Sequence, residues 1–182
     1  MIKTGIIIGR FQVPYLHKGH KYLINTALKE CEKVVFLLGV NKEDGKNLEK
    51  YPYKIGERLA NIRKEYDFSP KIDYFPLYDY NNDLLWSKQV DSICSRFTNP
   101  ILYHSRDSFK KSYITRKYPL REVLEIKGYS GTKIRKESMS KLYYDGNQLE
   151  RKYDIEDDKI SFFNRIIIAV FILLLFTLII NT

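Results

Sequence analysis

Apolar residues along this chain form short continuous runs that alternate with segments of helical periodicity. A run of isoleucines ends at Gly9, and a longer apolar run covers residues 34–40. Between them, apolar residues recur every three or four positions over residues 19–31. Continuous apolar runs are typical of strands that are buried on both faces, and two such strands around one helix form a βαβ unit. The first forty residues therefore predict two parallel strands joined by a helix.

The alternation of apolar runs and periodic segments continues to about residue 138. Residues 41–53 are polar and rich in Lys, Gly and Pro, which predicts a loop. We expect Asp83 to cap a helix, because Asp is a favoured N-cap residue. The pattern predicts a Rossmann-like, doubly wound parallel α/β sheet of about five strands, with its ligand beyond the carboxyl ends of the strands. The later strands are expected at residues 71–77, 100–104 and 121–126, and the later helices at residues 55–66, at 83–97 and from Ser130 onward.

The C-terminal part of the sequence differs from the rest. Residues 139–159 are polar and charged, which predicts a helix and linker after a domain of residues 1–138. Residues 160–182 include a nearly unbroken apolar run, and 21 residues of helix would reach about 31 Å, close to the thickness of a bilayer core. We expect a single-pass C-terminal membrane anchor, although a buried core helix is the alternative. Positive residues precede the run, so the domain should lie on the cytoplasmic side.

Composition narrows the classes of partner. The net charge of +9 on 182 residues would suit nucleic acid, an anionic membrane surface or small polyphosphates. The positive charge is spread along the chain without a recognised nucleic-acid-binding motif, so we expect no nucleic-acid partner. Cys31 and Cys94 are far from metal-ligand spacing, which predicts reduced thiols and no protein metal site.

Two histidines follow the first predicted strand at the expected start of a helix. His17 and His20 are three residues apart, so both would face the same way beside backbone N–H groups that lack intrahelical acceptors. Gly9 would let the backbone approach a ligand closely. Because such a helix start attracts phosphate, the segment predicts an anion site. A surface loop whose histidines only cap the helix is the alternative.

A second helix start with similar chemistry follows the last predicted strand. Ser130 and Thr132 are capping residue types, and Gly131 permits close approach of a ligand. Arg135 lies one turn after Thr132 on the same helix face. Capping alone would explain the serine and threonine, but it would not explain the arginine. The segment therefore predicts a second anion site that faces the first.

Three motifs carry a resemblance to a known superfamily. They are Gly-Arg-Phe-Gln at residues 9–12, His-Lys-Gly-His at residues 17–20 and Tyr-Ser-Gly-Thr-Lys-Ile-Arg at residues 129–135. They resemble the nucleotidyltransferase α/β-phosphodiesterase superfamily, and within it most closely the archaeal-type nicotinamide mononucleotide (NMN) adenylyltransferases. The loop before His17 is two residues longer than the family pattern, which leaves the shape of the acceptor pocket open.

The resemblance implies an enzyme that transfers AMP from ATP to NMN, giving NAD and pyrophosphate. It implies that His17, His20 and Arg135 stabilise the phosphates, while Mg²⁺ is carried by the ATP phosphates because no carboxylate cage is evident. A basic residue at the position of Lys50 reaches the phosphates in this family, although a solvated loop lysine is the alternative. The nucleotide-binding residues implied in this way are Gly9, Arg10, Phe11, Gln12, Lys50, Ser130, Gly131 and Thr132.

The acceptor side is expected around three residues near the ends of later strands. In the resembled family a tryptophan stacks on the nicotinamide ring, and Trp86 matches it. A lone tryptophan is more often a core residue, and the resemblance reverses that expectation. Arg106 follows a predicted strand and could hold the acceptor phosphate or pair with a surface carboxylate. Asp83 would stand at the start of the same helix as Trp86.

Other functions remain open from the sequence alone. Another acceptor, such as phosphopantetheine, FMN or a cytidylyl-accepting alcohol phosphate, would use the same phosphate machinery. A membrane-tethered sensor could instead bind ATP or NAD without turnover, although the intact histidines and Arg135 favour an enzyme. The sequence is compatible with a homo-oligomer and does not determine the oligomeric state.

Overall fold

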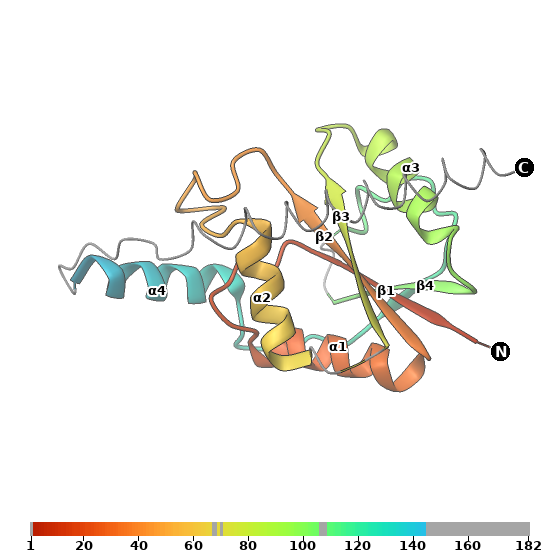
Figure 1. Ribbon diagram of the computed structural model, residues 1–182, viewed down its shortest axis with the longest axis horizontal. Coiled ribbons are helices and arrows are strands. Elements are labelled where there is room, and N and C mark those ends of the chain that lie inside the picture. The colour runs from red at the N-terminus through yellow and green to blue at the C-terminus, as the bar shows by residue number, and fades with distance from the viewer. Residues whose placement is uncertain (1, 67–68, 70, 106–108, 145–182) are drawn as a thin grey trace, which may run out of the picture. The chain divides into compact units, whose positions relative to one another are not determined.

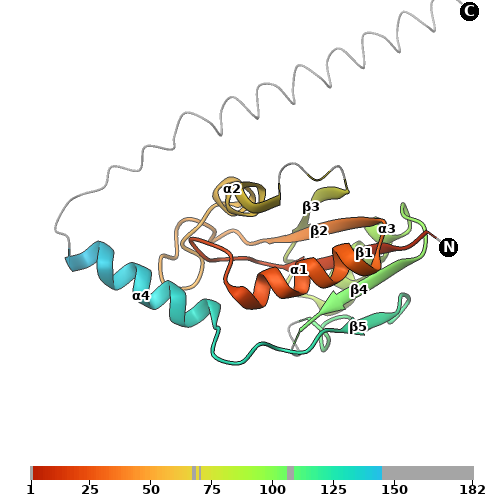
Figure 2. The same ribbon diagram turned by 90° about the horizontal axis from the view of Figure 1, so that it is seen from below.

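Five parallel strands form one sheet, as the apolar pattern predicts. The computed structural model describes residues 2–66, 69, 71–105 and 109–144, and residues up to Lys141 form one unit. The spatial order of the strands is β3-β2-β1-β4-β5, which Figure 2 shows from one side of the sheet to the other. Every neighbouring pair is parallel. The strands are β1 Thr4–Gly9, β2 Lys33–Val40, β3 Ile72–Tyr78, β4 Pro100–His104 and β5 Leu120–Glu122.

Helices cover both faces of this sheet, so the predicted doubly wound fold is confirmed. The chain builds β1, β2 and β3 outward in one direction and then returns to place β4 on the other side of β1. Because parallel crossovers are right-handed, this reversal puts α1 and α2 on one face and α3 on the other (Figure 1). The helices are α1 Lys18–Glu30, α2 Ile55–Tyr66, α3 Asp83–Cys94 and α4 Gly131–Tyr144.

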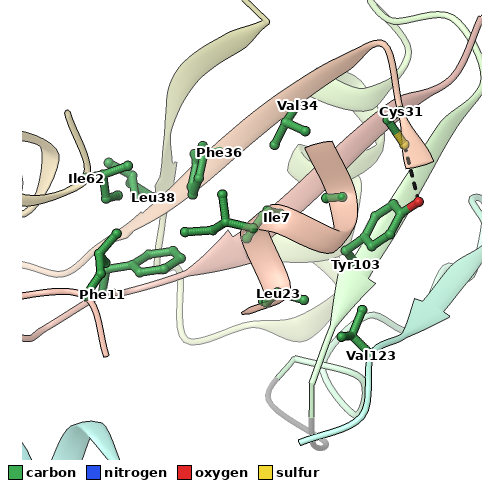
Figure 3. Close-up of a cluster of buried hydrophobic side chains, with 13 residues drawn as sticks. Ile7, Phe11, Leu23, Cys31, Val34, Phe36, Leu38, Ile62, Tyr103 and Val123 are labelled. Atoms are coloured by element: carbon green, nitrogen blue, oxygen red, sulfur yellow. Dashed lines mark hydrogen bonds between the residues drawn. The ribbon is translucent and has the colours of Figure 1, made fainter. Parts of the chain in front are cut away.

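The isoleucines of β1 explain why its sequence is apolar without alternation. Ile7 belongs to the cluster beneath α1 and α2, whereas Ile6 and Ile8 belong to the cluster beneath α3. Figure 3 shows the first cluster, in which the Cys31 thiol and the Tyr103 hydroxyl lie 3.3 Å apart. A central strand that is buried on both faces needs apolar residues at every position, which is why the run predicts it correctly.

Two helices begin with side-chain caps that fix their first turns. The Nδ1 atom of His17 accepts a hydrogen bond from the backbone N–H of His20 at 3.3 Å, at the start of α1. In α3 the side chain of Asn82 accepts from the N–H of Leu85 at 3.0 Å. The predicted cap, Asp83, is therefore wrong by one residue, because Asn82 has the extended backbone of a cap and Asp83 is already helical.

Later element boundaries differ in detail from the sequence prediction. Strand β5 stops at Glu122 rather than continuing to residue 126, and α3 ends at Cys94 rather than near residue 97. Within the described part of residues 2–144, no helix is long and apolar enough to cross a bilayer. The predicted anchor, residues 160–182, lies outside the residues that the structure describes.

Candidate active site

The first cleft of interest lies between the loop after β1 and the start of α4. Its volume is about 350 Å³. It brings together residues of all three motifs. A hydrogen bond joins Gln12 of the first motif to Arg135 of the third, 123 residues later in the sequence. We call it the nucleotide cleft. Its lining residues are Arg10, Phe11, Gln12, Val13, His20, Lys50, Tyr51, Gly131 and Arg135.

The two histidines at the start of α1 form a stacked pair. Their ring centroids are 3.7 Å apart and the ring planes differ by 21°. Because Nδ1 of His17 accepts the cap hydrogen bond, the proton of a neutral His17 ring lies on Nε2. The capping role considered from the sequence therefore applies to one nitrogen of His17, and His20 is held directly against that ring.

His20 is half-buried, like His17, and one of its ring nitrogens is fully enclosed. Its Nδ1 atom is buried and has no hydrogen-bond partner, and its ring lies 5.0 Å from that of Phe11. Burial, with a smaller contribution from the neighbouring His17, lowers the pKa of His20 to about 3. The imidazole is therefore neutral at physiological pH, with one nitrogen as donor and the other as acceptor.

Arg135 reaches from the first turns of α4 toward the loop after β1. Its Nη1 donates to the backbone oxygen of Gln12 at 3.1 Å, and its Nη2 donates to the Thr132 hydroxyl at 3.0 Å. A further donor, Nε, is buried without a partner. Burial lowers the pKa of Arg135, but a guanidinium stays protonated in proteins. A half-buried cation with a buried, unpaired Nε therefore lies in the wall of the cleft.

Gly9 and Phe11 form a unit that the sequence did not reveal. A Cβ atom on Gly9 would lie 2.8 Å from the ring of Phe11, so glycine is required by a side chain of the protein itself. Phe11 has φ of +47°, which is uncommon for a non-glycine residue. The predicted close approach of a ligand to Gly9 is thus restricted on that side by Phe11, whose ring packs beside His20 instead.

Gln12 fastens the loop of residues 41–54. Its side-chain amide accepts from the N–H of Tyr53 and donates to the carbonyl of Tyr53, both at 3.0 Å, and also donates to Asp44 at 2.9 Å. Only 4% of Gln12 is exposed. Both of its amide N–H groups are used within the protein, so its predicted contact with the nucleotide would depend mainly on the backbone.

Arg10 stands where two clefts meet. Its Nη2 forms a 2.8 Å ion pair with Asp79, and its Nη1 donates to the hydroxyl of Tyr51 at 3.0 Å. The second cleft has a volume of about 370 Å³ and lies at the carboxyl ends of β1 and β3. We call it the acceptor cleft. Its lining residues are Ile8, Gly9, Arg10, Gly39, Leu77, Asp79, Asn81, Asn82, Asp83, Trp86, Phe109 and Ser112.

Trp86 belongs to the wall of the acceptor cleft and also to the edge of the core. Its ring lies 6.3 Å from the ring of Phe109, and it packs against the apolar cluster beneath α3. Half-burial of this kind leaves one part of the indole beside the cleft. The predicted phosphate ligand Arg106 lies outside the described residues, and Ser130 lines a neighbouring cleft together with His17.

Among the cleft residues that the sequence prediction missed, three contact residues that it had included. Tyr51 and Asp79 hold Arg10, and Phe109 contacts Trp86. Asp79 directly follows β3, so its place at the carboxyl edge could have been inferred from the topology. Tyr51 and Phe109 are in loops, for which the sequence gives no comparable signal.

The described residues contain no group of three or more His, Cys, Asp and Glu side chains that could hold a metal ion. The polar side chains that meet in the nucleotide cleft are instead mainly cations and neutral donors. A divalent ion in this cleft would therefore need oxygen ligands from a substrate and water.

Comparisons with known proteins give consistent results. A family model described as cytidylyltransferase-like matches residues 6–137. A nicotinamide-nucleotide adenylyltransferase from Methanococcus maripaludis is 30% identical over 139 residues, which cover 74% of this chain and 77% of the relative. A protein of the same name from Haloarcula marismortui is 35% identical over 96 residues, 51% of this chain and 48% of the relative. The matched region thus spans about half the length of one relative and about three quarters of the other.

Solved structures show a similar fold. A bifunctional NMN adenylyltransferase/ADP ribose pyrophosphatase from Francisella tularensis has a TM-score of 0.65 and 22% identity, over 78% of this chain and 43% of that protein. A second structure of that protein, complexed with AMP and a Mn ion, has a TM-score of 0.62. The chain spans less than half of that protein, and at this identity the likeness supports the sheet topology alone.

Proposed function

The chain belongs to the cytidylyltransferase-like family, and on this premise we propose that it transfers the adenylyl group of ATP to NMN, giving NAD and pyrophosphate. Two archaeal relatives named nicotinamide-nucleotide adenylyltransferase, from Methanococcus maripaludis and Picrophilus torridus, support this choice of substrates. In each case the match covers about three quarters of the relative's own length.

One structural observation carries the proposal. Nδ1 of His20 and Nε of Arg135 are buried polar atoms without partners, and both residues line the nucleotide cleft. Leaving buried polar groups unsatisfied is costly, and such groups in a native protein call for an explanation. A triphosphate supplies acceptor oxygens for the guanidinium and, with a proton on Nδ1, for the imidazole. The start of α4 adds backbone N–H groups that favour an anion.

The chemistry requires alignment rather than a general base. An oxygen of the NMN phosphate, already an anion, attacks the α-phosphorus of ATP, while the bond from that phosphorus to the bridging oxygen breaks and pyrophosphate leaves. His17, His20 and Arg135 would hold the β and γ phosphates and stabilise the charge that develops on the leaving group. Neutral His20 acts as a hydrogen-bond donor in this scheme. It does not act as a permanent cation.

NMN would occupy the acceptor cleft. The indole of Trp86 offers a flat surface for the cationic pyridinium ring. Arg10 lines both clefts, so its guanidinium would lie between ATP and the acceptor phosphate. Mg²⁺ would enter as a complex with ATP and belongs to the substrate, since the described residues offer no dedicated metal site.

A panel of acceptors tests the proposal. Pyrophosphate release from ATP would be measured with NMN, phosphopantetheine and FMN, with CTP and glycerol phosphate as a further pair. We expect release with NMN, accompanied by NAD in equal amount. Pyrophosphate release only with another acceptor would assign the protein a different reaction within the family. ATP binding without any pyrophosphate release would indicate a sensor.

We also propose that residues 160–182 anchor the protein in a membrane, with the described domain on the cytoplasmic side. The support is the apolar composition of this segment and the positive residues that precede it.

A further inference from the structure

A buried ion pair lies behind the nucleotide cleft. Arg58 of α2 is 0% exposed, and its Nη2 pairs with the carboxylate of Asp44 at 2.7 Å. Its Nη1 donates to the backbone oxygens of Arg10 at 2.6 Å and Gly39 at 2.8 Å. One guanidinium therefore ties the end of β1, the end of β2 and the loop of residues 41–54 to the helix α2.

Asp44 is the acceptor at the centre of this arrangement. One of its oxygens accepts from Arg58 and from the N–H of Asn41 at 3.0 Å, and the other accepts from Gln12 at 2.9 Å. An asparagine in its place would turn an NH₂ group toward one of these donors and would remove the carboxylate that pairs with Arg58. A buried cation without a partner is strongly unfavourable, so the loop would have to move to hydrate it.

The loop that Asp44 holds carries the cleft wall. Lys50 and Tyr51 line the nucleotide cleft, and Tyr51 contacts Arg10 both through its hydroxyl and through its ring, 5.1 Å from the guanidinium carbon. Asp44 and Arg58 are not among the residues that line the cleft. Any effect they have on the substrate must therefore pass through the residues they position.

The charges of this region are balanced in two pairs. Burial lowers the pKa of Arg58, the nearby Arg10 lowers it further, and the carboxylate of Asp44 opposes both effects. Arg10 has its own partner in Asp79. Without Asp44, an unneutralised Arg58 would repel Arg10 from the junction of the two clefts.

From these contacts we propose that Asp44 is a positioning residue for ATP: by neutralising Arg58 it holds the loop of residues 41–54 so that Lys50 and Tyr51 face the phosphates. The inference rests on the proposed function, because it concerns the same nucleotide cleft.

A double-mutant cycle tests this role. Asp44→Asn, Lys50→Ala and the double variant would be compared with wild type for KM of ATP, KM of NMN and kcat. We expect Asp44→Asn to raise KM for ATP at least about tenfold, since small displacements of binding groups have large effects, and to change KM for NMN less. Lys50→Ala alone should clearly raise KM for ATP. Added to Asp44→Asn, the same substitution should raise KM for ATP hardly any further.

A matched control distinguishes an effect on the position of the loop from a general loss of protein stability. Asp73→Asn removes a carboxylate that pairs with Lys33 at 2.6 Å on the neighbouring strands, and it should leave KM for ATP unchanged. All assays would be run well below the melting temperature of the least stable variant. If Asp44→Asn does not fold, Asp44→Glu, which keeps the charge but displaces it, takes its place in the same cycle.

The outcomes are distinct. Non-additive effects of the two substitutions on KM for ATP support the inference. Additive effects, or a lowered melting temperature with an unchanged KM for ATP, contradict it and leave Asp44 a purely structural residue. Absence of turnover in wild type contradicts the proposed function instead, and the cycle would then be read from ATP binding alone.

Discussion

At the scale of single residues, the site is shaped by contacts that no sequence pattern contains. His17, His20 and Arg135 could be predicted because their residue types and spacing at helix starts indicate phosphate chemistry. The contact between Gly9 and Phe11, in contrast, depends on a φ of +47° and a ring that folds back over the glycine. Such tertiary contacts decide which predicted residue has its side chain available for a ligand.

The acceptor assignment is tested at Trp86. If the indole stacks on nicotinamide, Trp86→Ala should weaken the binding of NMN by about 1 to 2 kcal/mol, the value of a cation–π contact that is partly or fully desolvated. The binding of ATP should weaken much less. The measurement is KM or Kd for each substrate, with Trp86→Phe as the conservative variant that keeps an aromatic face. Equal losses for both substrates together with a lower melting temperature would show that Trp86 acts only through the core.

The lowered pKa of His20 predicts a pH dependence of stability. The pKa is about 3 in the folded protein and about 6.5 in the unfolded chain. Below pH 6.5 the unfolded chain binds a proton that folded His20 does not bind, so stability falls between pH 6.5 and 3. Urea denaturation of wild type and His20→Gln at pH 7 and pH 4.5 should show roughly 2 kcal/mol more loss in wild type. An identical loss in both proteins would mean that His20 titrates normally.

At the scale of elements, the helical and strand periods predicted most of the structure. The ranges predicted for α2 and β4 match the structure to the residue. The errors are at ends, where a cap depends on the backbone angles of a single residue, as at Asn82. Strand β5 is short because only Leu120–Glu122 pairs with β4 in register, and the apolar residues that follow do not continue the strand.

The start of α1 serves both as a helix end and as a phosphate site, and the two roles can be separated. His17→Asn should preserve stability, because Asn is a favoured cap, but it should lower kcat because the second ring nitrogen is lost. His17→Ala should lose activity and also about 1 kcal/mol of stability. Thermal melting and steady-state kinetics of the two variants give the comparison. Full activity in His17→Asn would show that His17 acts only as a helix cap.

At the scale of the whole molecule, alternating strands and helices indicated a doubly wound sheet but not the strand order. The order β3-β2-β1-β4-β5 places the switch point beside β1, which is why Gly9 and Arg10 line the acceptor cleft. The sequence could suggest this edge as the site, but the division into two clefts joined by Arg10 requires the folded loops.

The membrane anchor is a prediction for the whole chain. Deleting residues 160–182 should leave a soluble and active domain, because the family match ends at residue 137. The full chain should sediment with membranes and resist extraction by salt or alkali, since about 20 apolar residues suffice to span a bilayer. A truncated protein that aggregates, while the full chain stays in solution, would instead assign the segment to the core of the fold.

The central claim is that the nucleotide cleft is the site of adenylyl transfer, and the most direct measurement is the rate of NAD formation from ATP and NMN in His20→Ala. Loss of a donor that stabilises transition-state charge predicts a decrease in kcat of about 10² or more. Lys29→Ala, an exposed position at the other end of the same helix, should keep the wild-type rate. A wild-type rate of NAD formation in folded His20→Ala would contradict the assignment of the site.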